Sequence, residues 1–317
     1  MDTLKDKDWD SLLRRIQDGN CTPFLGAGAC AGFIPLGSEI AQEWARSYGY
    51  PLTDCWDLAR VAQFLAVKRD PMFPKDEIVN RFRTVVPPDF NAPDEPHGVL
   101  ADLPLPIYIT TNYDDFMIRA LRSRHRNPSR ELCRWNSLIR DRPSIFDPGS
   151  GIEVSVANPV VFHLHGYTEV PESLVLTEDD YLDFLVRISR EPQIIPSRIV
   201  KALAGTSLLF IGYRLADWDF RVLFRGLIGS LERSLGRIRV AVQLAPEPPE
   251  TGGITREQVQ QYLEDYLARD DVRVYWGKAT DFARELRARW EAFRSGTTVS
   301  YTHLRAHETP EHLVCRL

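Results

Sequence analysis

The chain lacks both a long apolar run and an excess of basic residues. No stretch approaches the roughly 18 uninterrupted apolar residues of a membrane-spanning helix, and the first residues lack the apolar core of a signal peptide. Lys and Arg number 39 against 44 Asp and Glu, a formal net charge of -5. This balance disfavours direct nucleic-acid binding over a broad surface. We therefore expect a cytoplasmic protein with no membrane partner.

The chain also has few cysteines, and they follow no regular pattern. There are five, an odd number, and no two of them stand two residues apart. A disulfide framework needs an even, regularly spaced set, so a reducing compartment fits better. The remaining composition, 44% hydrophobic and 26% charged, is ordinary for a globular protein.

The last residues, 297–317, differ from the rest of the chain. They break the preceding helical pattern and resemble translated sequencing-adapter read-through, so we set them aside as a non-native tail. A zinc site has a superficial appeal there, because the tail holds His303, His307, His312 and Cys315, but we do not adopt it. On this reading, residues 1–296 are the folded domain, and a natural C-terminus with a further domain could be missing.

Short Val- and Ile-rich runs alternate with amphipathic helical segments. This alternation predicts an α/β fold with a mostly parallel sheet and helices on both faces. Residues from about 50 to 100 hold helical patterns without strands and predict an inserted helical lobe. The expected strands are 22–25, 107–111, 131–135, 160–164, 207–211, 238–244 and 272–276. The expected helices lie near 8–17, 38–44, 57–68, 75–84, 114–122, 178–188, 196–203, 217–231, 257–267 and from 280 onward.

A glycine-rich turn follows the first expected strand. Gly26, Ala27 and Gly28 are small enough for the backbone to approach a pyrophosphate and bind it through N–H groups at a helix N-terminus. The third glycine of the full dinucleotide fingerprint is not in place, so a plain tight turn is an equal alternative.

Polar residues follow the next strand. Asn112 and Asp114 stand two residues apart, directly after the expected strand at 107–111. A carboxamide and a carboxylate at a strand end are suited to hydrogen-bond an amide-bearing ring and to bind a water molecule. Capping of the next helix is an alternative for Asp114, but it does not explain Asn112.

Two further strand ends carry candidate residues. His163 and His165 end the strand at 160–164, and alternation points both to one face. We interpret His163 as a core residue and His165 as functional. Gly212 and Tyr213 follow the strand at 207–211. Asp217, a few residues further on, is a candidate site residue and also a candidate helix cap.

Taken together, these four motifs resemble the sirtuin family. Thr111-Asn112-Tyr113-Asp114 and Ile211-Gly212-Tyr213 are similar to its bacterial branch of anti-phage defence. The resemblance implies a Rossmann-like sheet with NAD across the strand ends. It implies catalytic roles for Asn112, Asp114 and His165, with a near-neutral pKa suiting His165 as a general base. It further implies NAD contacts for a larger set of residues: Gly26, Ala27, Gly28, Cys30, Thr111, Gly212, Tyr213 and Asp217.

The chain departs from the family's protein deacetylases in three places. Cys30 replaces the usual serine after the glycine turn, and Thr111 replaces the glutamine before the asparagine. No cysteine lies between His165 and Gly212, where deacetylases carry a four-cysteine zinc module. We therefore expect no zinc or other metal, and no acyl-lysine cleft.

The resemblance leads to an NAD glycohydrolase that releases nicotinamide and ADP-ribose and acts in anti-phage defence by NAD depletion. It implies a homo-oligomer or a defence partner, such as a translocase ATPase or an Argonaute-like protein. Two alternatives stay open. One is a module that senses NAD or ADP-ribose without cleaving it, and the other is a protein deacylase or ADP-ribosyltransferase.

Overall fold

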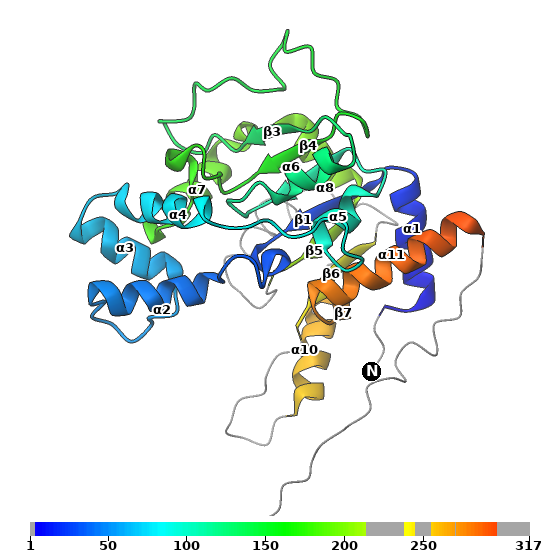
Figure 1. The fold of residues 1–317 in the computed structure, drawn as a ribbon, viewed down its shortest axis with the longest axis horizontal. Helices are drawn as coiled ribbons and strands as arrows, with labels where there is room; N and C mark the ends of the chain where they lie inside the picture. The colour runs from blue at the N-terminus through cyan, green and yellow to red at the C-terminus, as the bar shows by residue number, and fades with distance from the viewer. Residues whose placement is uncertain (1–3, 214–237, 245–254, 270, 297–317) are drawn as a thin grey trace, which may run out of the picture.

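The computed structural model describes residues 4–213, 238–244, 255–269 and 271–296 (Figure 1). Its strands are β1 (Cys21–Leu25), β2 (Ile107–Thr110), β3 (Ser129–Leu132), β4 (Val160–His163), β5 (Ser207–Ile211), β6 (Arg239–Gln243) and β7 (Val272–Trp276). The α-helices are α1 (Asp6–Gln17), α2 (Gly37–Tyr48), α3 (Leu58–Lys68), α4 (Phe73–Arg83), α5 (Pro96–Ala101), α6 (Phe116–Ser123), α7 (Glu178–Arg190), α8 (Ser197–Gly205), α10 (Arg256–Ala268) and α11 (Ala279–Ser295). Short 3-10 turns are η1 (Ala27–Cys30), η2 (Pro171–Ser173) and η3 (Pro192–Ile194).

The seven described strands form one sheet in the order β3-β4-β2-β1-β5-β6-β7. Every pairing among them is parallel. The predicted α/β class with a mostly parallel sheet is therefore confirmed. Most strand ends agree with the expected ones within two residues, although β3 begins and ends earlier than the run at 131–135 predicted.

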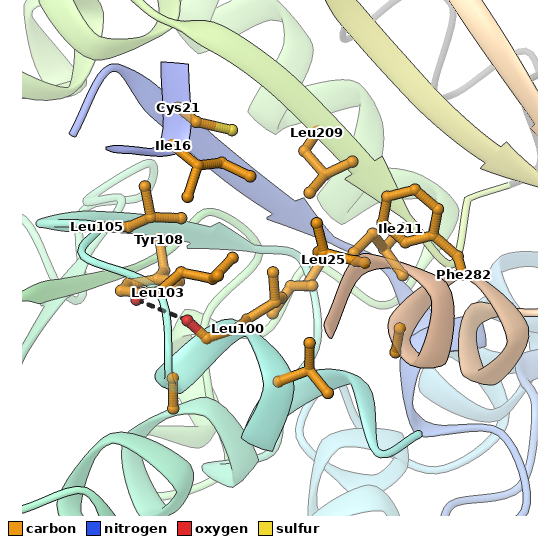
Figure 2. Close-up of a cluster of buried hydrophobic side chains, with 14 of the residues drawn as sticks. Ile16, Cys21, Leu25, Leu100, Leu103, Leu105, Tyr108, Leu209, Ile211 and Phe282 are labelled. Atoms are coloured by element: carbon orange, nitrogen blue, oxygen red, sulfur yellow. Dashed lines mark hydrogen bonds between the residues drawn. The ribbon is translucent and has the colours of Figure 1, made fainter. Parts of the chain in front are cut away.

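Successive residues of the strands enter two separate cores. On β5, Leu208 and Phe210 pack on one face with α7 and α8, while Leu209 and Ile211 pack on the other. The second face is covered by α1, α5, α6 and α11, and Figure 2 shows Ile16, Leu100 and Phe282 meeting the strand residues there. Both faces are buried, which explains why the strands read as continuous apolar runs.

Helices α2, α3 and α4 lie together to one side of the sheet (Figure 1) and share their own apolar core. Trp44, Val61 and Ile78 contribute one buried side chain from each helix. This helical group is joined to α7 by a buried ion pair in which Lys75 Nζ lies 2.9 Å from Asp180 Oδ1. Asp180 also accepts the N–H groups of Leu176 and Thr177 through Oδ2, so a single carboxylate connects α4 to the start of α7.

One described helix was not expected from the sequence, and one expected helix lies outside the residues that the structure describes. Helix α5 was not predicted, because Pro96 at its start and its short length conceal its pattern; Glu95 caps it by accepting the Gly98 N–H. The expected helix at 217–231 and the tail at 297–317 lie outside the described residues. In the described part of the chain, no helix is long and apolar enough to span a membrane.

Candidate active site

The connections from β1 and β5 leave in opposite directions, toward β2 and toward β6. Open α/β sheets bind ligands at such a switch point, beyond the carboxyl ends of the strands. The Gly26–Gly28 turn follows β1, and Gly212 follows β5. The sheet therefore brings the first and fourth sequence motifs together at this position.

The two glycine segments are in direct backbone contact. A Cβ on Gly28 would lie 2.9 Å from the Gly212 Cα, and one on Gly26 would lie 2.8 Å from the Gly212 oxygen. Gly212 itself has φ +83°, a conformation that glycine adopts readily. Side chains are excluded here because two backbones pack against each other.

This contact also uses N–H groups of the turn. The Gly26 N–H donates to the Ile211 oxygen and the Gly28 N–H donates to the Gly212 oxygen, both at 2.9 Å. Those two N–H groups are therefore engaged within the protein, and Ala27 at the start of η1 is the member of the turn whose N–H could face a phosphate.

Tyr213, after β5, contacts residues of β1 and the residue that follows β2. Its hydroxyl donates to the Leu25 oxygen at 3.0 Å and lies 2.7 Å from Thr111 Oγ1. Its ring packs edge-on against Phe24. Thr111 and Tyr213, both expected to contact NAD, are thus in contact with each other.

Asn112 projects from the end of β2 onto the glycine turn. Its Nδ2 donates to the Gly26 oxygen at 3.1 Å and to Cys30 Sγ at 3.2 Å. Its own N–H is held by Thr110 Oγ1 at 2.9 Å. The side chain is buried, with 9% exposure, so its amide is fixed in orientation rather than swinging in solvent.

Asp114 caps the next helix, as the alternative from the sequence proposed, and also contacts Cys30. Its Oδ1 caps α6 by accepting the Phe116 N–H at 2.9 Å. Its Oδ2 accepts the Cys30 thiol proton at 3.2 Å. Burial and the nearby Asp114 charge raise the pKa of Cys30 well above its usual range, which keeps the thiol protonated.

Sequence reasoning missed two residues of this cluster, Glu95 and His97. His97 Nε2 lies 3.8 Å from Cys30 Sγ, while its Nδ1 lies 2.7 Å from Glu95 Oε1. A carboxylate only accepts hydrogen bonds, so this contact places a ring proton on Nδ1. The available signal was a charged Glu-Pro-His step entering an otherwise apolar helix, but nothing in the sequence links it to Cys30.

The two histidines after β4 have different surroundings. His163 Nδ1 lies 3.3 Å from the backbone oxygen of Asn112. Its Nε2 is buried and has no hydrogen-bond partner among the described residues. His165 lies just beyond the strand, in a turn, with its ring edge-on to Tyr181 and Phe184. Gly166 allows this turn, because its φ is +83° and a Cβ would lie 2.3 Å from the Ser173 oxygen.

Burial lowers the pKa of His165 to about 3, and burial with the Arg130 charge does the same for His163. The near-neutral pKa expected for His165 is therefore wrong. The cause is desolvation, which penalises the charged imidazolium. Asp217, the remaining predicted contact, lies outside the described residues.

An open, parallel sheet covered by helices, with glycine turns and buried polar side chains at its switch point, defines the Rossmann-type class of α/β proteins. The model of the SIR2-like domain matches residues 106–270, just over half of the chain. The chain therefore belongs to the SIR2-like domain family.

Among curated proteins, this chain is similar to two enzymes named NAD(+) hydrolase ThsA. The one from Cytobacillus dafuensis is 26% identical over 232 residues, covering 72% of this chain and 40% of the relative. The one from Bacillus cereus (strain MSX-D12) is 22% identical over 311 residues, covering 92% and 60%. The chain thus spans about half the length of these relatives.

Among solved structures, one from work on the "Structural Basis for the Mechanism and Regulation of Sir2 Enzymes" matches with a TM-score of 0.44 and 14% identity. The match covers 92% of this chain and 100% of that chain.

Proposed function

We propose that this protein is an NAD glycohydrolase that cleaves the bond between nicotinamide and ribose. The observation that carries the proposal is the position of Asn112 against the Gly26–Gly28 turn, with Asp114 beside it in contact with Cys30 at the end of η1. The resemblance to enzymes named NAD(+) hydrolase supports the choice of NAD as substrate.

In this reaction, water adds to the ribose carbon through an oxocarbenium-like state, and nicotinamide leaves with the bonding electron pair. Asn112 would position the water and contact the ribose. Asp114, partly exposed, would hold the nicotinamide carboxamide. Ala27 and the neighbouring glycines would contact the pyrophosphate, with Tyr213 and Thr111 forming the opposite wall.

His165 would take the proton from the water or from a ribose hydroxyl. It is neutral at physiological pH and is therefore in the form that accepts a proton. Its low pKa makes it a weak base in the ligand-free protein. We infer that NAD binding must change its surroundings before it can act.

The test is release of nicotinamide and loss of NAD by purified protein at several protein concentrations. We expect Asn112→Ala and His165→Ala to reduce turnover at least a hundredfold, about the lower bound for one general base. Substitution of the exposed His125 by Asn serves as a matched control and should leave turnover unchanged. Turnover retained in both site variants would contradict the proposal.

A second candidate is a module that senses NAD or ADP-ribose without cleaving it. The observation in its favour is that the Asn112 amide nitrogen already donates to the Gly26 oxygen and to Cys30 Sγ. Calorimetry separates the candidates, since a sensor binds NAD and releases no nicotinamide at any protein concentration.

We further propose a role in anti-phage defence through NAD depletion, exerted as a homo-oligomer or with a partner protein. Expression in a phage-challenged host, beside Asn112→Ala, tests this role. Protection that persists in a variant shown to be inactive would separate the defence role from NAD cleavage.

A further inference from the structure

Three side chains from distant parts of the sequence meet behind the Gly26–Gly28 turn. Cys30 ends η1, His97 lies on α5, and Asp114 follows β2. One potential ligand atom from each lies within 4.8 Å of the other two. Cys30 and His97 are almost fully buried, at 2% and 1% exposure, while Asp114 is partly exposed. We propose that Cys30, His97 and Asp114 bind a soft divalent metal ion of the Zn²⁺ class.

The spacing of these atoms suits tetrahedral coordination. Zinc binds sulfur at about 2.3 Å and nitrogen or oxygen at about 2.0–2.2 Å, which separates neighbouring ligand atoms by roughly 3.3–3.7 Å. Cys30 Sγ lies 3.8 Å from His97 Nε2 and 3.2 Å from Asp114 Oδ2. His97 and Asp114 also have ligand atoms within 4.8 Å of each other, so side-chain adjustments would bring the three atoms into three of the four tetrahedral positions and leave one open.

The surroundings of the three ligands also suit a metal. Glu95 Oε1 accepts a hydrogen bond from His97 Nδ1, so Nε2 is directed at the thiol and is, in the neutral ring, the nitrogen able to bind a metal. Metal-binding histidines are commonly held by a carboxylate in this way. Asn112 Nδ2 donates to Cys30 Sγ and would stabilise the thiolate. Binding displaces the thiol proton to solvent, and no electrons are transferred.

No metal was expected from the sequence, because no two cysteines have the close spacing of a zinc module. His97 is 67 positions and Asp114 is 84 positions from Cys30 in the sequence. No short spacing pattern therefore links the three residues. Their convergence is a product of the fold.

If the proposed NAD cleavage holds, the metal has a consequence for it. Asp114 would be shared between the metal and the nicotinamide carboxamide, so Zn²⁺ and NAD would compete. This consequence rests on the proposed function, whereas metal binding itself does not.

The test is titration of the full chain with Co²⁺, followed by the thiolate-to-cobalt charge-transfer absorption in the near ultraviolet. We expect one equivalent to bind, Zn²⁺ to displace it, and Cys30→Ser to abolish the absorption. His97→Gln should weaken binding at least tenfold. Glu95→Gln should keep the absorption but weaken binding 10- to 100-fold, about the usual effect of losing a group that holds a ligand.

Two variants serve as matched controls. Cys55→Ser removes a partly buried thiol elsewhere, and Cys315→Ser removes the thiol nearest to the C-terminal histidines. Both should leave the titration unchanged. Absorption that persists in Cys30→Ser, or that is lost in Cys315→Ser, would overturn the proposal.

Circular dichroism and thermal melting establish that each variant is folded. If Cys30→Ser does not fold, Asp114→Asn replaces it, since it keeps the thiol and should weaken Co²⁺ binding at least tenfold; unchanged binding in that variant would also overturn the proposal. Calorimetric NAD titration with and without Zn²⁺ separates the two hypotheses. Failure to bind NAD without metal counts against the proposed function alone, while absence of Co²⁺ binding counts against the metal site alone.

Discussion

At the scale of single residues, Gly212 packs against the first glycine turn with no room for a side chain. A Cβ on Gly212 would lie 2.3 Å from the Ala29 nitrogen and 2.6 Å from the Gly26 oxygen, both backbone atoms that cannot rotate away. Its φ of +83° adds the strain of a left-handed conformation. We expect Gly212→Ala to lower the free energy of unfolding by about 3 kcal/mol or more, measured by urea denaturation.

Gly49 is the matched control for this substitution. It has φ +70°, and a Cβ there would meet nothing within 4 Å. Gly49→Ala therefore carries the conformational strain without the overlap and should cost about 1 kcal/mol. Equal losses in the two variants would show that strain alone explains the glycine at 212.

At the scale of elements, the α2–α4 group depends on a buried charge for its attachment to α7. Lys75 and Asp180 have side chains 8% and 14% exposed, so removing the lysine leaves a largely desolvated carboxylate without its cation. Breaking such a pair costs about 3–5 kcal/mol. Asp180 also accepts hydrogen bonds from two backbone N–H groups, which remain in the variant. We therefore expect Lys75→Ala to lower the free energy of unfolding by about 3 kcal/mol, the lower end of this range, measured by urea denaturation.

Arg81, also on α4, provides the control. It pairs with Glu43, whose side chain is 55% exposed. Exposed pairs of this kind contribute up to about 1 kcal/mol, so Arg81→Ala should have a small effect. A loss for Lys75→Ala no larger than that for Arg81→Ala would mean that the apolar core of α2–α4, and not the ion pair, holds the helices in place.

At the scale of the whole molecule, two buried histidines couple stability to pH. Their pKa values fall from 6.5 to about 3 on folding. The neutral form is favoured in the folded protein, so the contribution is full above pH 6.5 and is lost as pH falls toward 3. Between pH 7 and pH 5, each histidine should reduce the free energy of unfolding by about 2 kcal/mol.

Urea denaturation at the two pH values measures this loss. His163→Leu should halve it, because that side chain no longer takes up a proton on unfolding. His125→Asn, at an exposed position, should leave it unchanged. An acid sensitivity that His163→Leu does not reduce would assign the loss to other groups.

The strands and most helices were predictable from the sequence, because burial on both faces imposes apolar runs and single-face burial imposes helical periodicity. The class of fold followed from their alternation. The sequence also indicated Asn112, Asp114 and the two glycine segments, because polar residues and glycines at strand ends stand out against apolar strands.

Which of these residues meet depends on the three-dimensional fold. Strand order brought Gly212 onto the Gly26–Gly28 turn, and the fold carried Glu95 and His97 to Cys30 across more than sixty residues. It also decided that His165 lies between aromatic rings, where burial lowers its pKa. Sequence periodicity records which face a residue occupies, but contacts and desolvation depend on neighbours that are distant along the chain.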